Sequence, residues 1–258
     1  MRDKTIGFVG GGRVTRILLG GWTRAGHPLA GVVVSDTDEQ VLKRLRDERP
    51  AVTTTRDNLQ SAAQDVVLFA LHPPAFPQML DEVKGSLKPD ATVVSLAPKW
   101  TMPRIGAALG GFHRLSRVIP NAPSIVNAGY NPVSFHESLP PDARREVLSL
   151  FAPLGDCPEV PENTLETYAV VAAMGPTYLW YQLYLLADLA CEFGLDRGAA
   201  EAAVAAMVNG AVTTMVSSGM SREAVLDLIP VKPLAAIEPT VSEAYTGLLR
   251  ALHQKLKG

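Results

Sequence analysis

The sequence predicts an α/β protein in which an N-terminal doubly wound sheet is followed by a C-terminal all-helical domain. Strand-like and helix-like segments alternate up to about Pro161, which is the pattern of a parallel sheet covered by helices on both faces. From Glu162 onward the strand signals vanish, and Ala, Leu, Met and Val recur at helical spacing. The predicted domains are therefore residues 1–161 and 162–258.

The segment that sets the fold is a short apolar run, Ile6–Val9, that stops in three glycines and then becomes helical. Gly10 permits a tight exit from the strand, and Gly12 leaves room for a pyrophosphate to approach the N–H groups of a helix N-terminus. The third small position of this fingerprint is Thr15, which is bulkier than the usual glycine or alanine. The pattern indicates a Rossmann-type dinucleotide-binding turn, and a tight turn that binds no ligand is the alternative.

The second predicted strand, Gly31–Ser35, supports this interpretation because Asp36 follows it directly. This is about the twenty-residue spacing expected of a carboxylate that accepts hydrogen bonds from both ribose hydroxyls. Such a carboxylate repels a 2′-phosphate, and no arginine follows it in the loop Thr37–Glu39. The sequence therefore predicts NAD(P)H as the cofactor, with NADH favoured. A solvated loop carboxylate is the alternative for Asp36.

The remaining elements continue the alternation. Further strands are predicted at Val66–Ala70, Thr92–Ser95, Leu115–Ile119, Val133–Phe135 and Pro158–Val160. Helices are predicted at Arg13–Ala25, Thr37–Glu48, Leu59–Ala63, Pro77–Val83, Met102–Leu109 and Pro141–Phe151. Ligands of open α/β sheets bind outside the carboxyl ends of the strands. The predicted cofactor-binding residues are Gly10, Gly11, Gly12, Arg13, Val14, Ser35, Asp36, Ala70, Leu71, His72, Pro73, Ala97 and Asn121.

The helical domain carries more apolar surface than it can bury. The predicted helix Thr177–Phe193 is apolar nearly all round, so it must be covered on every side, and a domain of this size can hardly surround it alone. The next helical stretch, Val204–Met215, carries an apolar stripe that Gly219 closes. A homodimer is therefore predicted, and a monomer whose helices pack against its own first domain is the alternative.

Composition limits the possible partners. Of the 258 residues 47% are hydrophobic and 19% charged, and the formal net charge of −2 gives no basic surface for nucleic acid. No apolar run is expected to span a bilayer, and the first residues lack the apolar core of a signal peptide, so a cytoplasmic location is expected. Cys157 and Cys191 have no metal-ligand spacing, so neither a metal site nor a disulfide is expected. Small molecules and a second copy of the chain remain as partners.

Three further segments, together with the glycine turn, resemble the pyrroline-5-carboxylate reductase family. Ala70–Pro73 resembles the family's Ala-Val-Lys-Pro, and Arg117–Pro123 resembles its Arg-x-Met-Pro-Asn-x-Pro segment. Met174–Tyr178 resembles the Ser-Gly-Pro-Ala-Tyr that starts the family's long dimer helix. The resemblance is nearly full-length. It implies a Rossmann domain, a helical dimerisation domain, and reduction of a small C=N or C=O compound by NAD(P)H.

The chain departs from the family where the substrate should bind. The family's Ser-Pro-Gly-Gly-Thr-Thr loop, which holds the substrate carboxylate, falls near Val231–Ile237, where only Pro233 matches. The proline-pathway substrate therefore does not follow from the resemblance. Lys232 stands in this loop, and we predict that it anchors an anionic substrate; a surface turn is the alternative. Loss of the loop also leaves open a non-catalytic dinucleotide-binding protein.

The sequence offers further candidate site residues. Asn121 lies in a loop expected beside the nicotinamide, where its amide would orient the carboxamide, or it serves only the turn. His72 contacts the cofactor or is an ordinary loop histidine. Lys99 and Trp100 wall the substrate crevice, or the tryptophan simply packs. The predicted catalytic residues are Lys232 and Asn121. No side-chain arrangement for alcohol chemistry is evident, which favours an imine, because an imine asks less of acid catalysis.

Overall fold

A computed structural model of the chain describes residues 4–257 and divides it into two compact units. The first unit runs to Met174 and includes the chain end from Leu252, and the second unit is Gly175–Ala251. The first holds the sheet and the second is helical, so the predicted α/β fold with a C-terminal helical region is confirmed.

The first unit is built on a seven-stranded sheet of order β3-β2-β1-β4-β5-β6-β8. Its strands are β1 (Ile6–Val9), β2 (Val32–Ser35), β3 (Thr53–Thr55), β4 (Val66–Phe69), β5 (Thr92–Ser95), β6 (Leu115–Val118) and β8 (Val133–Phe135). All neighbouring strands are parallel except β6 and β8. The strand order reverses between β1 and β4, which is the position where open α/β sheets bind ligands.

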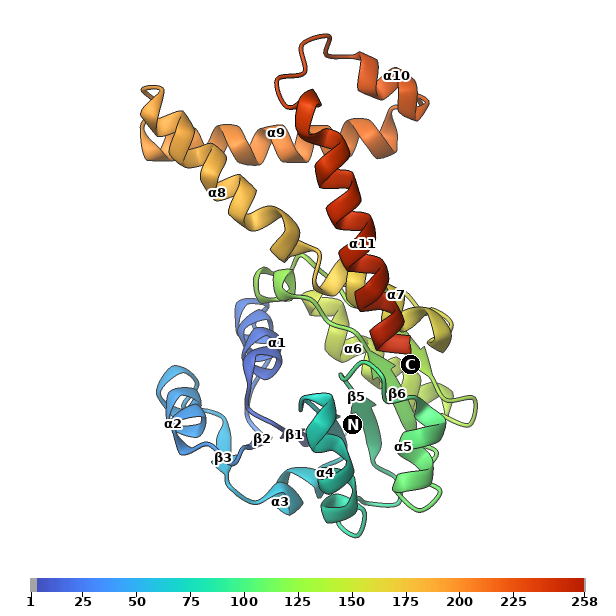
Figure 1. The fold of residues 1–258 in the computed structure, drawn as a ribbon. Coiled ribbons are helices and arrows are strands. Elements are labelled where there is room, and N and C mark those ends of the chain that lie inside the picture. Colours follow the sequence, from blue (N-terminus) through green and yellow to red (C-terminus); the bar gives the residue numbers. More distant parts are fainter. Residues whose placement is uncertain (1–3, 258) are drawn as a thin grey trace. The chain divides into compact units, whose positions relative to one another are not determined.

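Helices cover both faces of the sheet (Figure 1). One face is covered by α1 (Arg13–Arg24), α2 (Glu39–Glu48) and α6 (Pro141–Phe151), and the other by α3 (Asn58–Ala62), α4 (Phe76–Val83) and α5 (Met102–Ala108). Asp38 and Asp57 cap α2 and α3 by accepting hydrogen bonds from backbone N–H groups. A proline lies at the first or second position of α4, α5 and α6, where its missing N–H is not needed. Local sequence therefore fixes these helix starts.

Most predicted strands and helices of the first unit end within a residue or two of the observed ones. Two predictions differ. The edge strand β3 was not predicted, because Thr53–Thr55 is short and polar. The predicted strand Pro158–Val160 is only an isolated bridge at Glu159, since Pro158 lacks the N–H that a regular ladder needs. A small second sheet instead pairs β7 (Gly129–Tyr130) with β9 (Gly155–Asp156).

The first unit extends beyond the predicted boundary at Pro161. Beyond Pro161 it contains η4 (Glu162–Thr164), α7 (Leu165–Tyr168) and the π-helix η5 (Ala169–Ala173). The short helices η1 (Pro73–Ala75), η2 (Ala122–Val126) and η3 (Ala152–Leu154) lie before Pro161. Glu162 and Glu166 bind Arg117 of β6, which holds α7 to the sheet. Thr167 also bonds to His253 near the chain end. Contacts between distant residues, which a local pattern does not encode, set this boundary.

The second unit consists of α8 (Pro176–Glu192), α9 (Arg197–Ser217), α10 (Arg222–Asp227), η6 (Ala235–Ile237) and the main part of α11 (Glu238–Lys257). Asp196 and Ser221 cap α9 and α10. Little of this unit is buried within a single chain, and Ala187 and Ala200 are the buried residues of α8 and α9.

Helix α9 is the one helix among residues 4–257 whose length and apolar composition would allow it to cross a membrane. The sequence was expected to contain no run that could span a bilayer, and α9 differs from that expectation in its length and composition. A single helix of this kind is weak evidence for a membrane span, because the core helix of a soluble assembly has the same composition.

Candidate functional site

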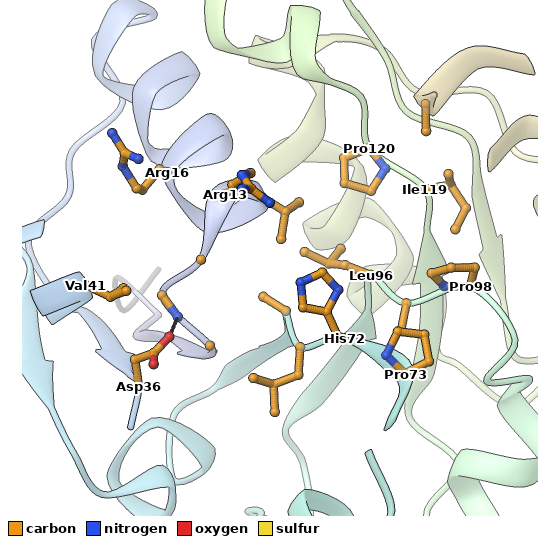
Figure 2. A pocket seen from close by; sticks show the side chains of 18 of the residues that line it. Arg13, Arg16, Asp36, Val41, His72, Pro73, Leu96, Pro98, Ile119 and Pro120 are labelled. Carbon is orange, nitrogen blue, oxygen red and sulfur yellow. Dashed lines mark hydrogen bonds between the residues drawn. The ribbon is translucent and has the colours of Figure 1, made fainter. Parts of the chain in front are cut away.

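A crevice of about 690 Å³ opens at the carboxyl ends of the parallel strands, within the first unit. Its walls come from the glycine turn after β1, from the loops after β2, β4, β5 and β6, and from the π-helix η5. Figure 2 shows Asp36 beside the glycine turn on one side, and His72, Pro98 and Pro120 toward the other. The volume suits a small-molecule ligand or cofactor.

The glycine turn is held in place by its own sequence. Gly10 has a φ of +106°, and a Cβ there would lie 2.7 Å from the Ala70 carbonyl oxygen, so only glycine fits. The hydroxyl of Thr15 donates a 2.6 Å hydrogen bond to the Gly10 carbonyl, and Thr15 is fully buried. Thr15, which departs from the usual fingerprint, therefore stabilises the turn from its buried side.

The start of α1 is open to a ligand. Gly12 is its N-cap residue and supplies no side-chain cap, and a Cβ on Gly12 would meet no atom within 4 Å. The first N–H groups of a helix have no partner within the helix, and the helix dipole favours an anion there. Gly12, Arg13 and Val14 all line the crevice. This geometry fits the pyrophosphate of a dinucleotide.

Asp36 lies at the end of β2 and points its carboxylate toward the glycine turn (Figure 2). One oxygen accepts a 2.8 Å hydrogen bond from the Gly11 N–H, and the other accepts one of 2.9 Å from the Asp38 N–H. Each carboxylate oxygen has a further lone pair, so the group still offers acceptors to a ribose. Asp36 lines the crevice, as a ribose-binding carboxylate must.

Three arginines also line this end of the crevice: Arg13, Arg16 and Arg44. Arg16 is bound to Glu48 at 3.0 Å. Within the described residues 4–257, neither Arg13 nor Arg44 forms a salt bridge. Positive charge is therefore available to cofactor phosphates beside the carboxylate of Asp36.

The loops after β4 and β5 form the other end of the crevice and are bonded to each other. The indole N–H of Trp100 donates a 3.1 Å hydrogen bond to the Pro73 carbonyl. Trp100 is buried, stacks on Phe76, and carries the Arg104 guanidinium 3.8 Å from its ring centre. The two crevice-lining loops are therefore fixed relative to each other by a packed aromatic group, as the packing alternative for Trp100 predicted.

A buried ion pair supports the loop after β5 from the opposite side. Arg117 is fully buried and binds Glu166 at 2.6 Å and Glu162 at 3.0 Å. Burial alone would raise the pKa of Glu166, but the hydrogen bond and positive charge of Arg117 lower it below its ordinary value. Glu166 also accepts a 3.0 Å hydrogen bond from the Lys99 N–H. The carboxylate thus joins α7, β6 and the β5 loop.

Most predicted cofactor-binding residues line the crevice together: Gly10, Gly11, Gly12, Arg13, Val14, Asp36, Ala70, Leu71, His72, Pro73 and Ala97. Two others do not line it. The Ser35 hydroxyl is buried and donates to Asn58. The Asn121 amide donates to the Ala172 carbonyl at 3.3 Å and accepts from the Tyr130 N–H at 3.0 Å, so its bonds hold the loop after β6.

Lys232 is exposed on the segment between α10 and η6 of the second unit. All residues that line the crevice belong to the first unit. The structure therefore shows the two predicted catalytic residues in different settings: Asn121 is buried in a hydrogen-bonded loop and Lys232 is exposed.

The crevice also contains residues that the predicted set lacked: Arg16, Asp38, Gln40, Val41, Arg44, Leu96, Pro98, Ile119, Pro120, Ala169, Ala173 and Met174. Those at strand ends could have been found by applying the strand-end rule to every loop. The residues of η5 had no such signal, since a π-helix has no sequence pattern of its own. Such helices occur often at functional sites.

Comparison with known proteins agrees with this geometry. The family described as "NADP oxidoreductase coenzyme F420-dependent" matches residues 5–99. Pyrroline-5-carboxylate reductase of Escherichia coli (strain K12) is 28% identical over 230 residues, covering 88% of this chain and 85% of that protein. A pyrroline-5-carboxylate reductase structure from Coxiella burnetii has a TM-score of 0.71 at 28% identity and covers 99% of this chain and 95% of its own.

The structure of Plasmodium falciparum pyrroline carboxylate reductase with NADP bound has a TM-score of 0.85. It covers 100% of this chain and 98% of its own at 19% identity, so it bears on the fold alone. Fold, crevice and matches together define an NAD(P)-dependent oxidoreductase. Within that class the chain is a reductase that resembles the pyrroline-5-carboxylate reductases, and the resemblance drawn from its motifs is confirmed.

Proposed function

We propose that the protein reduces a small cyclic imine that carries a carboxylate. The observation that carries the proposal is the crevice at the carboxyl ends of β1 and β4, in a chain whose relatives are named pyrroline-5-carboxylate reductases. The nicotinamide cofactor, when bound, supplies a hydride to the imine carbon. A proton added to the nitrogen completes the amine, so one C=N bond is reduced to C–N.

The chain's own residues bind and orient the reactants. The N–H groups at the start of α1 would hold the cofactor phosphates, and Asp36, which lines the crevice, would accept from the ribose hydroxyls. Leu96, Pro98 and Ile119 give the far end of the crevice an apolar lining, which limits water near the reacting carbon.

The cofactor preference we propose is NADH over NADPH. Asp36 is already bonded to the Gly11 and Asp38 N–H groups, so it cannot swing away from a 2′-phosphate without breaking both bonds. Like-charge repulsion there should favour NADH by about 1 to 2 kcal/mol, roughly one order of magnitude in affinity.

Calorimetric titration with both cofactors tests this preference. Asp36→Asn removes the charge and should narrow the difference in affinity between NADH and NADPH, while Asp47→Asn, which removes an exposed carboxylate of α2 that does not line the crevice, is the matched control. Equal or tighter binding of NADPH by the wild type would contradict the proposal. It would indicate that Arg13, which lines the crevice, or Arg56, which does not, serves the 2′-phosphate.

We further propose that the substrate is anionic and that Lys232 contributes to its binding. Its support is its position, which is where the family's carboxylate-binding loop falls although only Pro233 of that loop matches here; a single ammonium would replace several neutral donors. Lys232 is exposed within the single chain and so is accessible to a ligand.

A homodimer formed through the helical unit is the proposed assembly. Large apolar side chains of α8 and α9 are widely exposed in the single chain, including Tyr184 (68%) and Met215 (65%). Apolar surface of this extent is uncommon on a monomer, and a second copy of the same helices is a self-complementary cover for it.

The proposed activity is tested by following NADH oxidation over a panel of cyclic imines and oxo acids. Turnover of a cyclic imine carboxylate is expected, with much lower turnover at the same NADH concentration by a Gly12→Val variant that lacks the open phosphate site. Tight NADH binding without turnover of any panel member would favour the alternative, a dinucleotide-binding protein without catalysis.

A further inference from the structure

We propose that Lys99 is a second cation, besides Lys232, that binds the carboxylate of the substrate, an inference that rests on the proposed reduction of an imine carboxylate. Lys99 follows Leu96, Ala97 and Pro98, all of which line the crevice at the end of β5. Lys99 itself does not line the crevice, but it directly follows Pro98, whose end of the crevice lies away from the arginines that suit the cofactor phosphates.

The backbone of Lys99 is in an unusual conformation. Its φ is +73°, and Lys99 and Asn127 are the non-glycine residues with positive φ among residues 4–257. A side chain with a Cβ disfavours this region, and glycine adopts it freely. Glycine would therefore satisfy the turn better than lysine does. A lysine at such a position points to a use for its side chain.

Hydrogen bonds to neighbouring segments fix the backbone at Lys99. Its N–H donates to Glu166, which lies just before Ala169, a crevice-lining residue of η5. The next residue, Trp100, is bonded to the carbonyl of Pro73, which also lines the crevice. Lys99 thus lies among three crevice-lining segments, and its flexible four-carbon stem can bring the ammonium to a bound ligand.

The charge of Lys99 is not used within the chain. In the part of the chain that the structure describes, its ammonium forms no hydrogen bond and no ion pair, although the residue is half-buried. The Glu166 carboxylate, which accepts a hydrogen bond from the Lys99 backbone N–H, is already bound by the Arg117 guanidinium at 2.6 Å. An unpaired ammonium next to a crevice-lining loop is suited to an anionic substrate, because hydrogen bonds between ionised groups are the strong ones.

The test uses Lys99→Gly, which removes the ammonium and relieves the backbone, together with Lys99→Arg and the surface control Lys84→Met. Each protein is assayed with 1-pyrroline-carboxylate and with 1-pyrroline, which lacks the carboxylate, and its NADH affinity is measured by calorimetry. For the carboxylate substrate, Lys99→Gly should lower kcat/KM about tenfold or more, mainly through KM. Lys99→Arg should keep most of the activity, and 1-pyrroline turnover and NADH affinity should be unchanged.

Three results would overturn the inference: a Lys99→Gly variant as active as the wild type, an equal loss with 1-pyrroline, or a matching loss of NADH affinity. The first makes Lys99 a surface residue, the second makes it a loop-positioning residue, and the third assigns its charge to the cofactor. A wild type that reduces neither imine would instead refute the proposed function, which separates the two failures.

Discussion

The sheet unit and the helical unit treat their apolar side chains in opposite ways. In the sheet unit Phe8, Leu18 and Trp22 are fully buried, and the Trp22 indole bonds to the Leu150 carbonyl at 2.7 Å. In the helical unit Tyr184 is 68% exposed and Phe193 is 81% exposed. The first unit therefore completes its core within one chain, whereas the second leaves large apolar side chains exposed.

The largest expected effect comes from a charge in the helical unit. Leu186 is 41% exposed, and burying a glutamate there in a dimer should cost about 3 to 5 kcal/mol or more and abolish assembly. Sedimentation of Leu186→Glu should give the mass of one chain where the wild type gives two. The matched control is Leu59→Glu, because Leu59 is 39% exposed on the sheet unit and should leave assembly intact. A monomeric wild type would remove the contrast between the units.

The second effect probes the sheet unit's buried ion pair. Glu166→Leu removes one of the carboxylates that bind the buried Arg117 guanidinium. The free energy of unfolding should therefore fall by about 3 to 5 kcal/mol. Denaturant unfolding measures this loss. Glu39→Leu, which removes an exposed salt bridge to Arg46, should cost less than about 1 kcal/mol. Similar losses for both variants would contradict the role of the buried network.

The same carboxylate gives a pH dependence. The pKa of Glu166 is lower in the folded chain than its ordinary value, so the unfolded chain binds this proton more tightly. Its stabilisation is therefore complete above the unfolded pKa of about 4.3 and is lost as the pH falls through the lowered folded pKa. Unfolding curves of the wild type should show this acid loss, and those of Glu166→Gln should show less of it.

The third effect concerns cofactor binding to the sheet unit. A valine at Gly12 has open space in the fold and occupies the approach of the phosphate, so NADH affinity should fall by about 3 kcal/mol, roughly a hundredfold. Gly85→Val is the control, since a Cβ there also meets nothing within 4 Å. Unchanged calorimetric affinity in a folded Gly12→Val protein would refute the assignment of the turn.

The smallest effect belongs to the helical unit. Lys232→Met should lower kcat/KM for an anionic substrate by a factor that corresponds to about 1.5 to 3 kcal/mol of lost transition-state stabilisation. NADH binding should be almost unchanged. Steady-state kinetics beside the Lys84→Met control measure it. Turnover equal to the wild type would make Lys232 a surface lysine and would leave the substrate contacts to the sheet unit.

The elements that were predicted correctly are those set by local sequence signals. The strands β1 and β5 and the helix α6 were predicted to the residue, because alternation, glycine turns and prolines are local signals. The dinucleotide crevice followed from one rule about strand ends. The edge strand β3 and the π-helix η5 did not follow, since the first depends on pairing with β2 and the second on distant contacts.

The sequence by itself determined the class of fold, the glycine turn and the position of Asp36, because each depends on residues close together in the chain. Only the tertiary structure decided that the Asn121 amide is bonded to Ala172 and Tyr130, and that Glu166 extends the sheet unit past Pro161. It also gave Lys99 its left-handed backbone and its bond to Glu166. The physical reason is that these properties belong to pairs of groups far apart in sequence, whose meeting depends on the whole packed unit.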